Sequence, residues 1–88
     1  MPHYTILIVD DEAAQREVLA GFLKKKGYSV RASETGEKAL HVLRNETVDL
    51  VLSDMRMPEM DGAELLRRIK SLNPQIDVIV MTAFGSIE

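Results

Sequence analysis

Short apolar runs alternate with helix-like stretches along this sequence, and that alternation limits the fold more than any other feature. Four runs rich in β-branched and other apolar side chains are typical of strands: residues 4–9, 28–33, 48–53 and 77–81. The three intervals between them carry apolar residues at helical spacing. This order predicts a parallel sheet with right-handed crossovers and helices on both faces.

The interval after the first run predicts a helix with one apolar face against the sheet. Three lysines suit its C-terminal end, where the helix dipole favours positive charge, and Gly27 is a suitable cap. Residues 86–88 look like the first turn of a fourth helix. The inward residues expected in the first helix are Ala14, Val18, Leu19, Phe22 and Leu23.

Composition excludes several classes of function. The chain has 88 residues, enough for one domain, and a net charge of −3 without a basic surface that would suggest nucleic acid binding. Lysines 24–26 are interpreted as a solvated helix end, and His41 as a surface residue. The absence of cysteine excludes disulfides and suits a reducing compartment, so we expect a cytoplasmic protein. No apolar run is long enough for a membrane span or an export signal.

Acidic and hydroxyl side chains stand where the predicted strands end. Asp10 and Asp11 follow the first strand, Asp54 ends the third, and Thr82 follows the fourth. In a flavodoxin-like strand order the first and third strands are neighbours, so the three carboxylates would share one cleft. Such a cluster repels itself unless a cation is bound. Its oxygen ligands suit Mg²⁺ or Mn²⁺.

Simpler interpretations exist for each of these residues. Asp10 and Asp11 could cap the first helix, although that explains one aspartate better than two. Thr82 could be an ordinary strand end, and Asp54 an ordinary turn residue. Asp61, which precedes a glycine, is expected to cap the third helix. The loop methionines Met55, Met57 and Met60 are expected to pack the loop.

Taken in order, these motifs resemble the receiver domain of bacterial two-component response regulators. The resemblance covers the whole chain, and its closest match is to NtrC-like transcriptional activators. It implies a flavodoxin-like, three-layer sandwich with a parallel sheet, here βαβαβαβ plus the start of a fourth helix. The matching motifs are Asp10-Asp11 after residues 6–9, Asp54 followed by Met57-Pro58 and Met60-Asp61-Gly62, and Met81-Thr82-Ala83.

The resemblance also implies a role for each residue of the acidic cleft. Asp54 would accept a phosphoryl group from a sensor histidine kinase. Asp11 and Asp54 would bind Mg²⁺ directly and Asp10 through water, with the backbone carbonyl of Arg56 as a further ligand. Thr82 and Ala83 would bind the phosphoryl group and respond to it. The Arg56 side chain would lie at the mouth of the site, where it either tunes hydrolysis or is plain surface.

The chain departs from the receiver pattern at its C-terminal end. Receivers continue through a fourth helix, a fifth strand that carries a lysine, and a fifth helix. Residues 1–88 therefore resemble an incomplete receiver domain, either truncated or part of a longer chain, and the output domain that it would control is absent. A folded 88-residue chain would leave its fourth strand as an apolar edge. We therefore expect a homodimer or a segment-exchanged assembly.

Three functions compete at this point. The first is a phosphoacceptor signalling module, limited as an enzyme to self-phosphorylation and autodephosphorylation. The second is a half-domain with structural or assembly behaviour and no efficient phosphotransfer. The third is a Mg²⁺-dependent phosphohydrolase with an aspartyl-phosphate intermediate. Its pattern places two aspartates two residues apart on the first strand, whereas Asp10 and Asp11 are adjacent.

Overall fold

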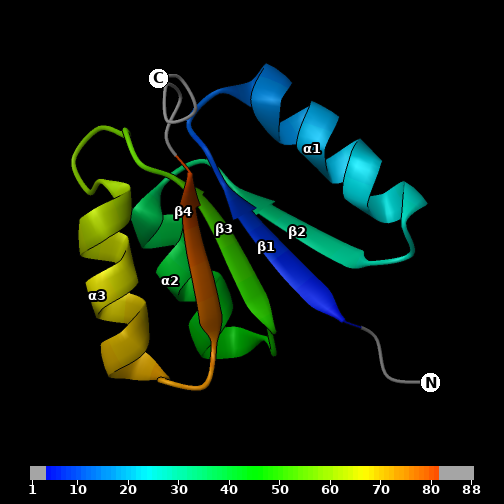
Figure 1. The fold of residues 1–88 in the computed structure, drawn as a ribbon. Helices are drawn as coiled ribbons and strands as arrows, with labels where there is room; N and C mark the ends of the chain where they lie inside the picture. Colours follow the sequence, from blue (N-terminus) through cyan, green and yellow to red (C-terminus); the bar gives the residue numbers. More distant parts are fainter. Residues whose placement is uncertain (1–3, 82–88) are drawn as a thin grey trace, which may run out of the picture.

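The computed structural model describes residues 4–81, which form a four-stranded parallel sheet with helices on both faces (Figure 1). The strands lie in the order β2-β1-β3-β4, so the prediction that the first and third strands are neighbours is confirmed. Residues 82–88, including Thr82, Ala83 and the expected start of a fourth helix, lie outside the described residues. The elements are β1 (Thr5–Val9), α1 (Ala13–Lys25), β2 (Ser29–Ser33), α2 (Gly36–Asn45), β3 (Leu50–Asp54), α3 (Gly62–Leu72) and β4 (Asp77–Met81).

The larger hydrophobic core lies between the sheet and helices α2 and α3. Strand β1 shows how it is built, because successive side chains of a strand point to opposite faces. Leu7 and Val9 are fully buried on the α2 and α3 side. The two helices complete this core with buried side chains one turn apart, such as Leu65 and Ile69. The remaining members are Ala39, Leu40, Val48, Val51, Met57, Met60 and Ile76.

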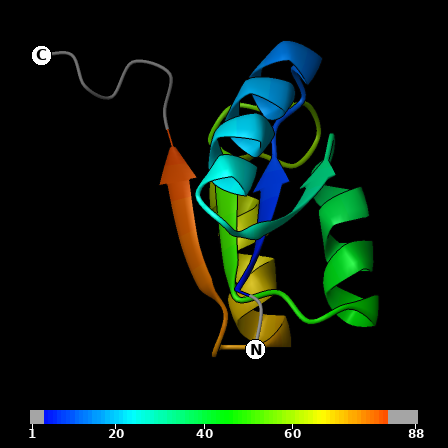
Figure 2. The same ribbon diagram turned by 90° about the vertical axis from the view of Figure 1, so that its right-hand side faces the viewer.

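The opposite core is smaller and lies under α1. Ile6 and Ile8 meet Leu23 there, with partly buried Leu19 and Ala20 around them. Helix α1 packs on β1 and β2, and Figure 2 shows β4 at the edge of the molecule, apart from α1.

The prediction of which α1 residues face the sheet is only partly confirmed. Leu19 and Leu23 face the sheet, but Ala14 is exposed, and Val18 and Phe22 are 74% and 56% exposed. Apolar residues cover a wide arc of this helix, and the sheet contacts only one side of that arc.

Capping side chains fix where α2 and α3 begin. Thr35 accepts a hydrogen bond from the backbone N–H of Lys38 at 3.1 Å. Asp61 accepts one from the N–H of Glu64 at 2.9 Å, which confirms its predicted capping role. These bonds satisfy N–H groups that the first turn of a helix leaves without a partner. None of the helices between residues 4 and 81 is long and apolar enough to cross a membrane.

Candidate functional site

Three aspartate side chains meet at the carboxyl edge of the sheet. The pairing of β1 with β3 aligns Val9 with Ser53, so the residues that follow, Asp10 and Asp54, stand side by side. Together with Asp11 they can each offer a carboxylate oxygen within 4.8 Å of the others. The structure thus brings together the three carboxylates that were predicted to meet where the strands end.

Asp10 is held firmly by its surroundings. It is buried, at 8% exposure, and its Oδ1 atom accepts the backbone N–H of Glu12 at 2.9 Å. Its own N–H donates to the carbonyl of Ser33 at 3.1 Å, and its carbonyl accepts from the Arg16 guanidinium at 2.8 Å. Asp10 therefore shapes the turn into α1, while Asp11 is exposed beside it. The simpler capping interpretation is not borne out, because Glu12 is the N-cap of α1, no side chain caps that helix, and Asp10 accepts the N–H of the cap residue itself.

Asp54 lies half-buried at the end of β3, and this environment disfavours its charge. Burial, followed by the nearby carboxylates of Asp10 and Asp11, raises the pKa of Asp54 above its ordinary value. The backbone N–H groups of Met55 and Arg56 oppose that shift in part. A cation among the three carboxylates would remove their mutual repulsion. The donor set, all carboxylate oxygen, is the kind that Mg²⁺ and Mn²⁺ take.

The remaining predicted site residues flank this cluster. Strand β4 aligns Met81 with Asp54, and the N–H of Met55 donates to the carbonyl of Met81 at 2.8 Å. The strand that leads to Thr82 thus ends beside Asp54, although Thr82 and Ala83 lie outside the described residues. Arg56 is exposed in the loop after β3, and its carbonyl as a metal ligand stays a prediction.

The loop between β3 and α3 is fixed at both ends. The N–H of Gly62, where the loop ends, donates to the carbonyl of Met55, where the loop begins, at 2.8 Å. Further along, Met57 and Met60 are buried, as predicted for loop packing, and Glu59 adopts a positive φ of 69°. The sequence motif contained Gly62, but its contact with the end of β3 could not be predicted from spacing.

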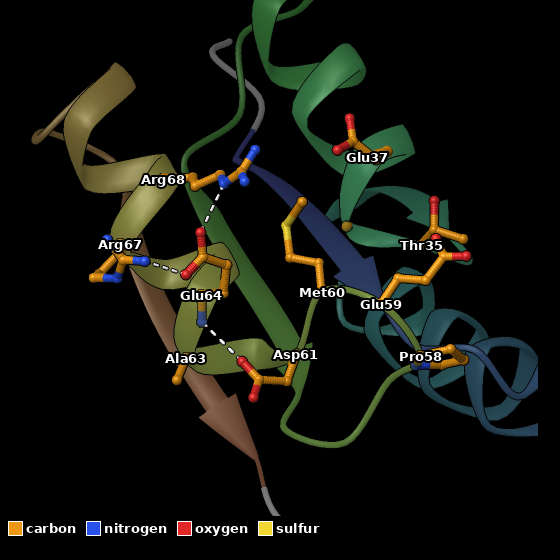
Figure 3. A pocket seen from close by; sticks show the side chains of 11 residues that line it. Thr35, Glu37, Pro58, Glu59, Met60, Asp61, Ala63, Glu64, Arg67 and Arg68 are labelled. Carbon is orange, nitrogen blue, oxygen red and sulfur yellow. Dashed lines mark hydrogen bonds and ion pairs between the residues drawn. The ribbon is translucent and has the colours of Figure 1, made fainter.

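A cavity of about 680 Å³ lies between the starts of α2 and α3 (Figure 3). Residues 58–61 of this loop form part of its lining. The Met60 side chain extends between the two helices. Glu64 pairs with both Arg67 and Arg68, the latter through Nε at 2.9 Å. No pattern in the sequence indicated this cavity. It is separate from the aspartate cluster, whose residues do not line it.

Sequence comparison identifies the protein family to which the chain belongs. The chain belongs to the response regulator receiver domain family, which it matches over residues 6–88. It is similar to the transcriptional regulatory protein ZraR of Escherichia coli, with 46% identity over 83 residues, 94% of this chain and 19% of ZraR. It is also 42% identical to sporulation initiation phosphotransferase F of Bacillus subtilis, over 100% of this chain and 71% of that protein. The chain thus spans about a fifth of the length of ZraR.

Solved structures confirm the flavodoxin-like, CheY-like fold. A CheY-like receiver domain from Methanospirillum hungatei superposes with a TM-score of 0.91 and 34% identity, over 98% of this chain and 69% of that one. Response regulator TrrA from Thermotoga maritima, solved with Mg²⁺ and BeF, gives 0.89 and 35%, over 93% and 71%. TrrA was also solved in complex with the histidine kinase ThkA, and that structure gives 0.87 and 36%, over 92% and 70%.

Proposed function

We propose that this chain is a phosphoacceptor module in which Asp54 receives a phosphoryl group from a sensor histidine kinase in a Mg²⁺-dependent reaction. The observation that carries the proposal is the cluster of Asp10, Asp11 and Asp54, with carboxylate oxygens within 4.8 Å of one another. A nucleophile flanked by two further carboxylates is poorly suited to attack a phosphate dianion unless their charge is neutralised. The cluster supplies both the nucleophile and the ligands for the cation that would neutralise it.

The chemistry is a single displacement at phosphorus. A carboxylate oxygen of Asp54 attacks the phosphoryl group, a P–O bond forms, and the P–N bond to the kinase histidine breaks. The electron pair of that bond remains on the imidazole nitrogen. Mg²⁺, when bound, neutralises charge on the phosphoryl oxygens. Asp11 and the carbonyl of Arg56 would hold it with Asp54, and Asp10 through water.

The residues after β4 complete the proposal. Thr82 and Ala83 follow the strand whose end pairs with Asp54, so they are suited to contact the phosphoryl group once it is on Asp54. The exposed Arg56 side chain, in the loop after β3, would modulate water attack on the acyl phosphate.

The partners follow from the relatives. The TrrA–ThkA complex supports a histidine kinase as the phosphoryl donor. ZraR, a transcriptional regulatory protein, supports an output domain that controls transcription, with residues 1–88 as the receiver part of a longer regulator. A cysteine-free chain also suits the reducing cytoplasm.

We also propose that separate copies of this 88-residue chain associate through β4. Among the described residues β4 forms one edge of the sheet, and its Ile79 is 50% exposed. An apolar edge strand is a template for pairing with another chain. Light scattering tests this proposal, because Ile79→Lys should lower the apparent mass of the assembly. A wild-type chain that is monomeric at high concentration would contradict it.

Intact-mass spectrometry after incubation with Mg²⁺ and acetyl phosphate tests the main proposal. We expect a gain of one phosphoryl group in the wild type and none in Asp54→Asn or in the presence of EDTA. Rapid multiple turnover would instead favour the phosphohydrolase, and a wild-type chain that is never modified would favour a structural half-domain.

A further inference from the structure

Helices α2 and α3 begin in the same way, with a capping side chain followed by a buried glycine. Thr35 precedes Gly36, and Asp61 precedes Gly62. At both glycines an added Cβ atom would lie 2.6 Å from its nearest neighbour, closer than real Cβ atoms approach. Within residues 4–81 only Gly27 among the glycines has a positive φ. Gly36 and Gly62 are therefore required for space and not for an unusual backbone conformation.

What a Cβ atom would meet differs between the two helices. At Gly62 it would lie 2.6 Å from the carbonyl oxygen of Asp54, 2.9 Å from Cα of Met55 and 2.9 Å from Cγ1 of Val80. Two of these three atoms are backbone atoms, one of Asp54, the proposed acceptor, and one of the residue that follows it, and backbone cannot turn aside as a side chain can. The 2.8 Å hydrogen bond from Gly62 to the Met55 carbonyl holds the same two segments together.

At Gly36 the obstacle is the side chain of Met60. A Cβ atom there would lie 2.6 Å from the sulfur and 3.2 Å from Cβ and Cγ of Met60. Methionine has three rotatable bonds and adapts to irregular space. The cavity between α2 and α3, into which Met60 extends, gives the sulfur room to move (Figure 3). An added methyl group at Gly36 should therefore move only the Met60 side chain. The same group at Gly62 should displace the backbone of Asp54 and Met55.

We propose that Gly62 is a positioning residue for the aspartate cluster, an inference that rests on the proposed function of Asp54. Without a side chain, Gly62 allows α3 to start directly against the peptide that joins Asp54 to Met55. That contact fixes the acceptor carboxylate relative to Asp10 and Asp11. A side chain at residue 62 would displace the peptide and widen the cluster.

The test compares Gly62→Ala with Gly36→Ala in the 88-residue chain. Each variant adds one methyl group to the first residue of a helix. NMR titration gives the Mg²⁺ dissociation constant, and the backbone amide shifts of Asp54 and Met55 report on the acceptor peptide. We expect Gly62→Ala to weaken Mg²⁺ binding about tenfold or more, as loss of support for metal ligands commonly does. It should also shift those amides, whereas Gly36→Ala should do neither.

Equal Mg²⁺ affinity in the wild type and Gly62→Ala would overturn the inference. The proposed function fails separately: a wild-type chain that takes no phosphoryl group, while Gly62→Ala still weakens Mg²⁺ binding, would remove the function and keep the positioning role. If Gly62→Ala alone does not fold, it is combined with Gly21→Ala. A Cβ atom at Gly21 meets nothing within 4 Å, and alanine favours the helix. A double variant that still fails to fold overturns the inference, because it requires a local displacement.

Discussion

Strand β3 has an aspartate at each end, and the surroundings of the two carboxylates differ: one accepts a backbone hydrogen bond and the other faces further carboxylates. Asp49 precedes the strand, and its Oδ2 atom accepts the backbone N–H of Thr5 at 2.8 Å. Its own N–H donates to the Thr5 carbonyl at 2.9 Å, so it is joined to β1 twice. Asp54, at the other end, faces the carboxylates of Asp10 and Asp11, and its pKa is raised by burial and by those charges.

The difference arises from what the neighbouring strand offers at each edge of the sheet. At the amino edge, β1 begins at Thr5 with an N–H group that needs an acceptor, and a carboxylate satisfies it. At the carboxyl edge, β1 delivers two more carboxylates. The side chain of Asp49 thus stabilises the fold through a hydrogen bond. The charge of Asp54 instead opposes folding and is available for a cation or a phosphoryl group.

The largest expected effect comes from the neighbours of Asp54. Asp11→Asn should weaken Mg²⁺ binding by roughly 10- to 100-fold, because it removes a charged oxygen ligand from the cluster. Calorimetric titration with Mg²⁺ measures the change, and the rate of labelling by acetyl phosphate should fall with it.

Glu12→Gln is the matched control for this substitution. Glu12 is the next residue, is exposed, makes no side-chain cap bond with α1 and lies outside the cluster. It should therefore leave the Mg²⁺ affinity near that of the wild type. Equal losses from Asp11→Asn and Glu12→Gln would mean that general negative charge, and not the cluster, attracts the cation.

The second prediction concerns the amino end of β3. Asp49→Ala should lower the free energy of unfolding by about 1.5–3 kcal/mol, the usual contribution of a hydrogen bond to a charged group. For a domain of this size that corresponds to a melting temperature lower by about 4–8 °C per kcal/mol. Thermal and urea denaturation measure both quantities.

Asp49→Asn separates the hydrogen bond from the charge, since its amide oxygen can still accept the Thr5 N–H. It should cost less stability than Asp49→Ala, and both variants should still be labelled at Asp54. If Asp49→Ala abolished labelling while remaining folded, the proposed division of β3 into a structural end and a functional end would be wrong.

Most of this contrast was accessible from sequence where it depended on which strands are neighbours or on residues adjacent in the chain. Strand order placed Asp10, Asp11 and Asp54 at one edge, because parallel strands end at the same side of a sheet. The cap formed by Asp61 was predicted from its place before a glycine and a helical pattern. Local periodicity and the rules of parallel sheets are thus enough to predict the aspartate cluster and the cap of α3.

Specific side-chain contacts were not accessible in the same way. Strand order does not say that the Asp49 side chain bonds the backbone of Thr5, and no motif connects these two residues. The apolar residues of α1 are too numerous to choose a buried side, so Val18 was assigned inward although it is exposed. The constraint on Gly62 exists only because α3 meets the backbone of β3 and a side chain of β4.

The third prediction is that removing the charge of Asp54 stabilises the protein without Mg²⁺. Asp54→Asn should raise the free energy of unfolding by about 1 kcal/mol, the interaction of two like charges about 4 Å apart in water. Calorimetry in EDTA measures this difference. Saturating Mg²⁺ should reverse the order, since it stabilises only the form that binds it. An Asp54→Asn variant less stable than the wild type in EDTA would show that Asp54, like Asp49, contributes to the fold.

The smallest expected effect is the pH dependence of that difference. Because the pKa of Asp54 in the folded state lies above its ordinary value of 3.8, the native protein binds a proton before the unfolded chain does as the pH falls. The wild type therefore regains stability relative to Asp54→Asn as the pH falls through the folded pKa, and the gain is complete below 3.8. The gap in melting temperature should be widest at neutral pH and narrowest in acid.

The shifted pKa values of Glu34 and Glu64 do not involve Asp54, so these two groups act equally in both variants. Hydrogen bonds from Lys38 and from Arg68 lower the pKa values of Glu34 and Glu64, so each contributes stability that is lost as the pH falls through its folded pKa. That loss cancels when the wild type is compared with Asp54→Asn at each pH. A gap that stays constant from neutral pH into acid would mean that the charge of Asp54 carries no cost in the folded state, and the two ends of β3 would then differ only in their hydrogen bonds.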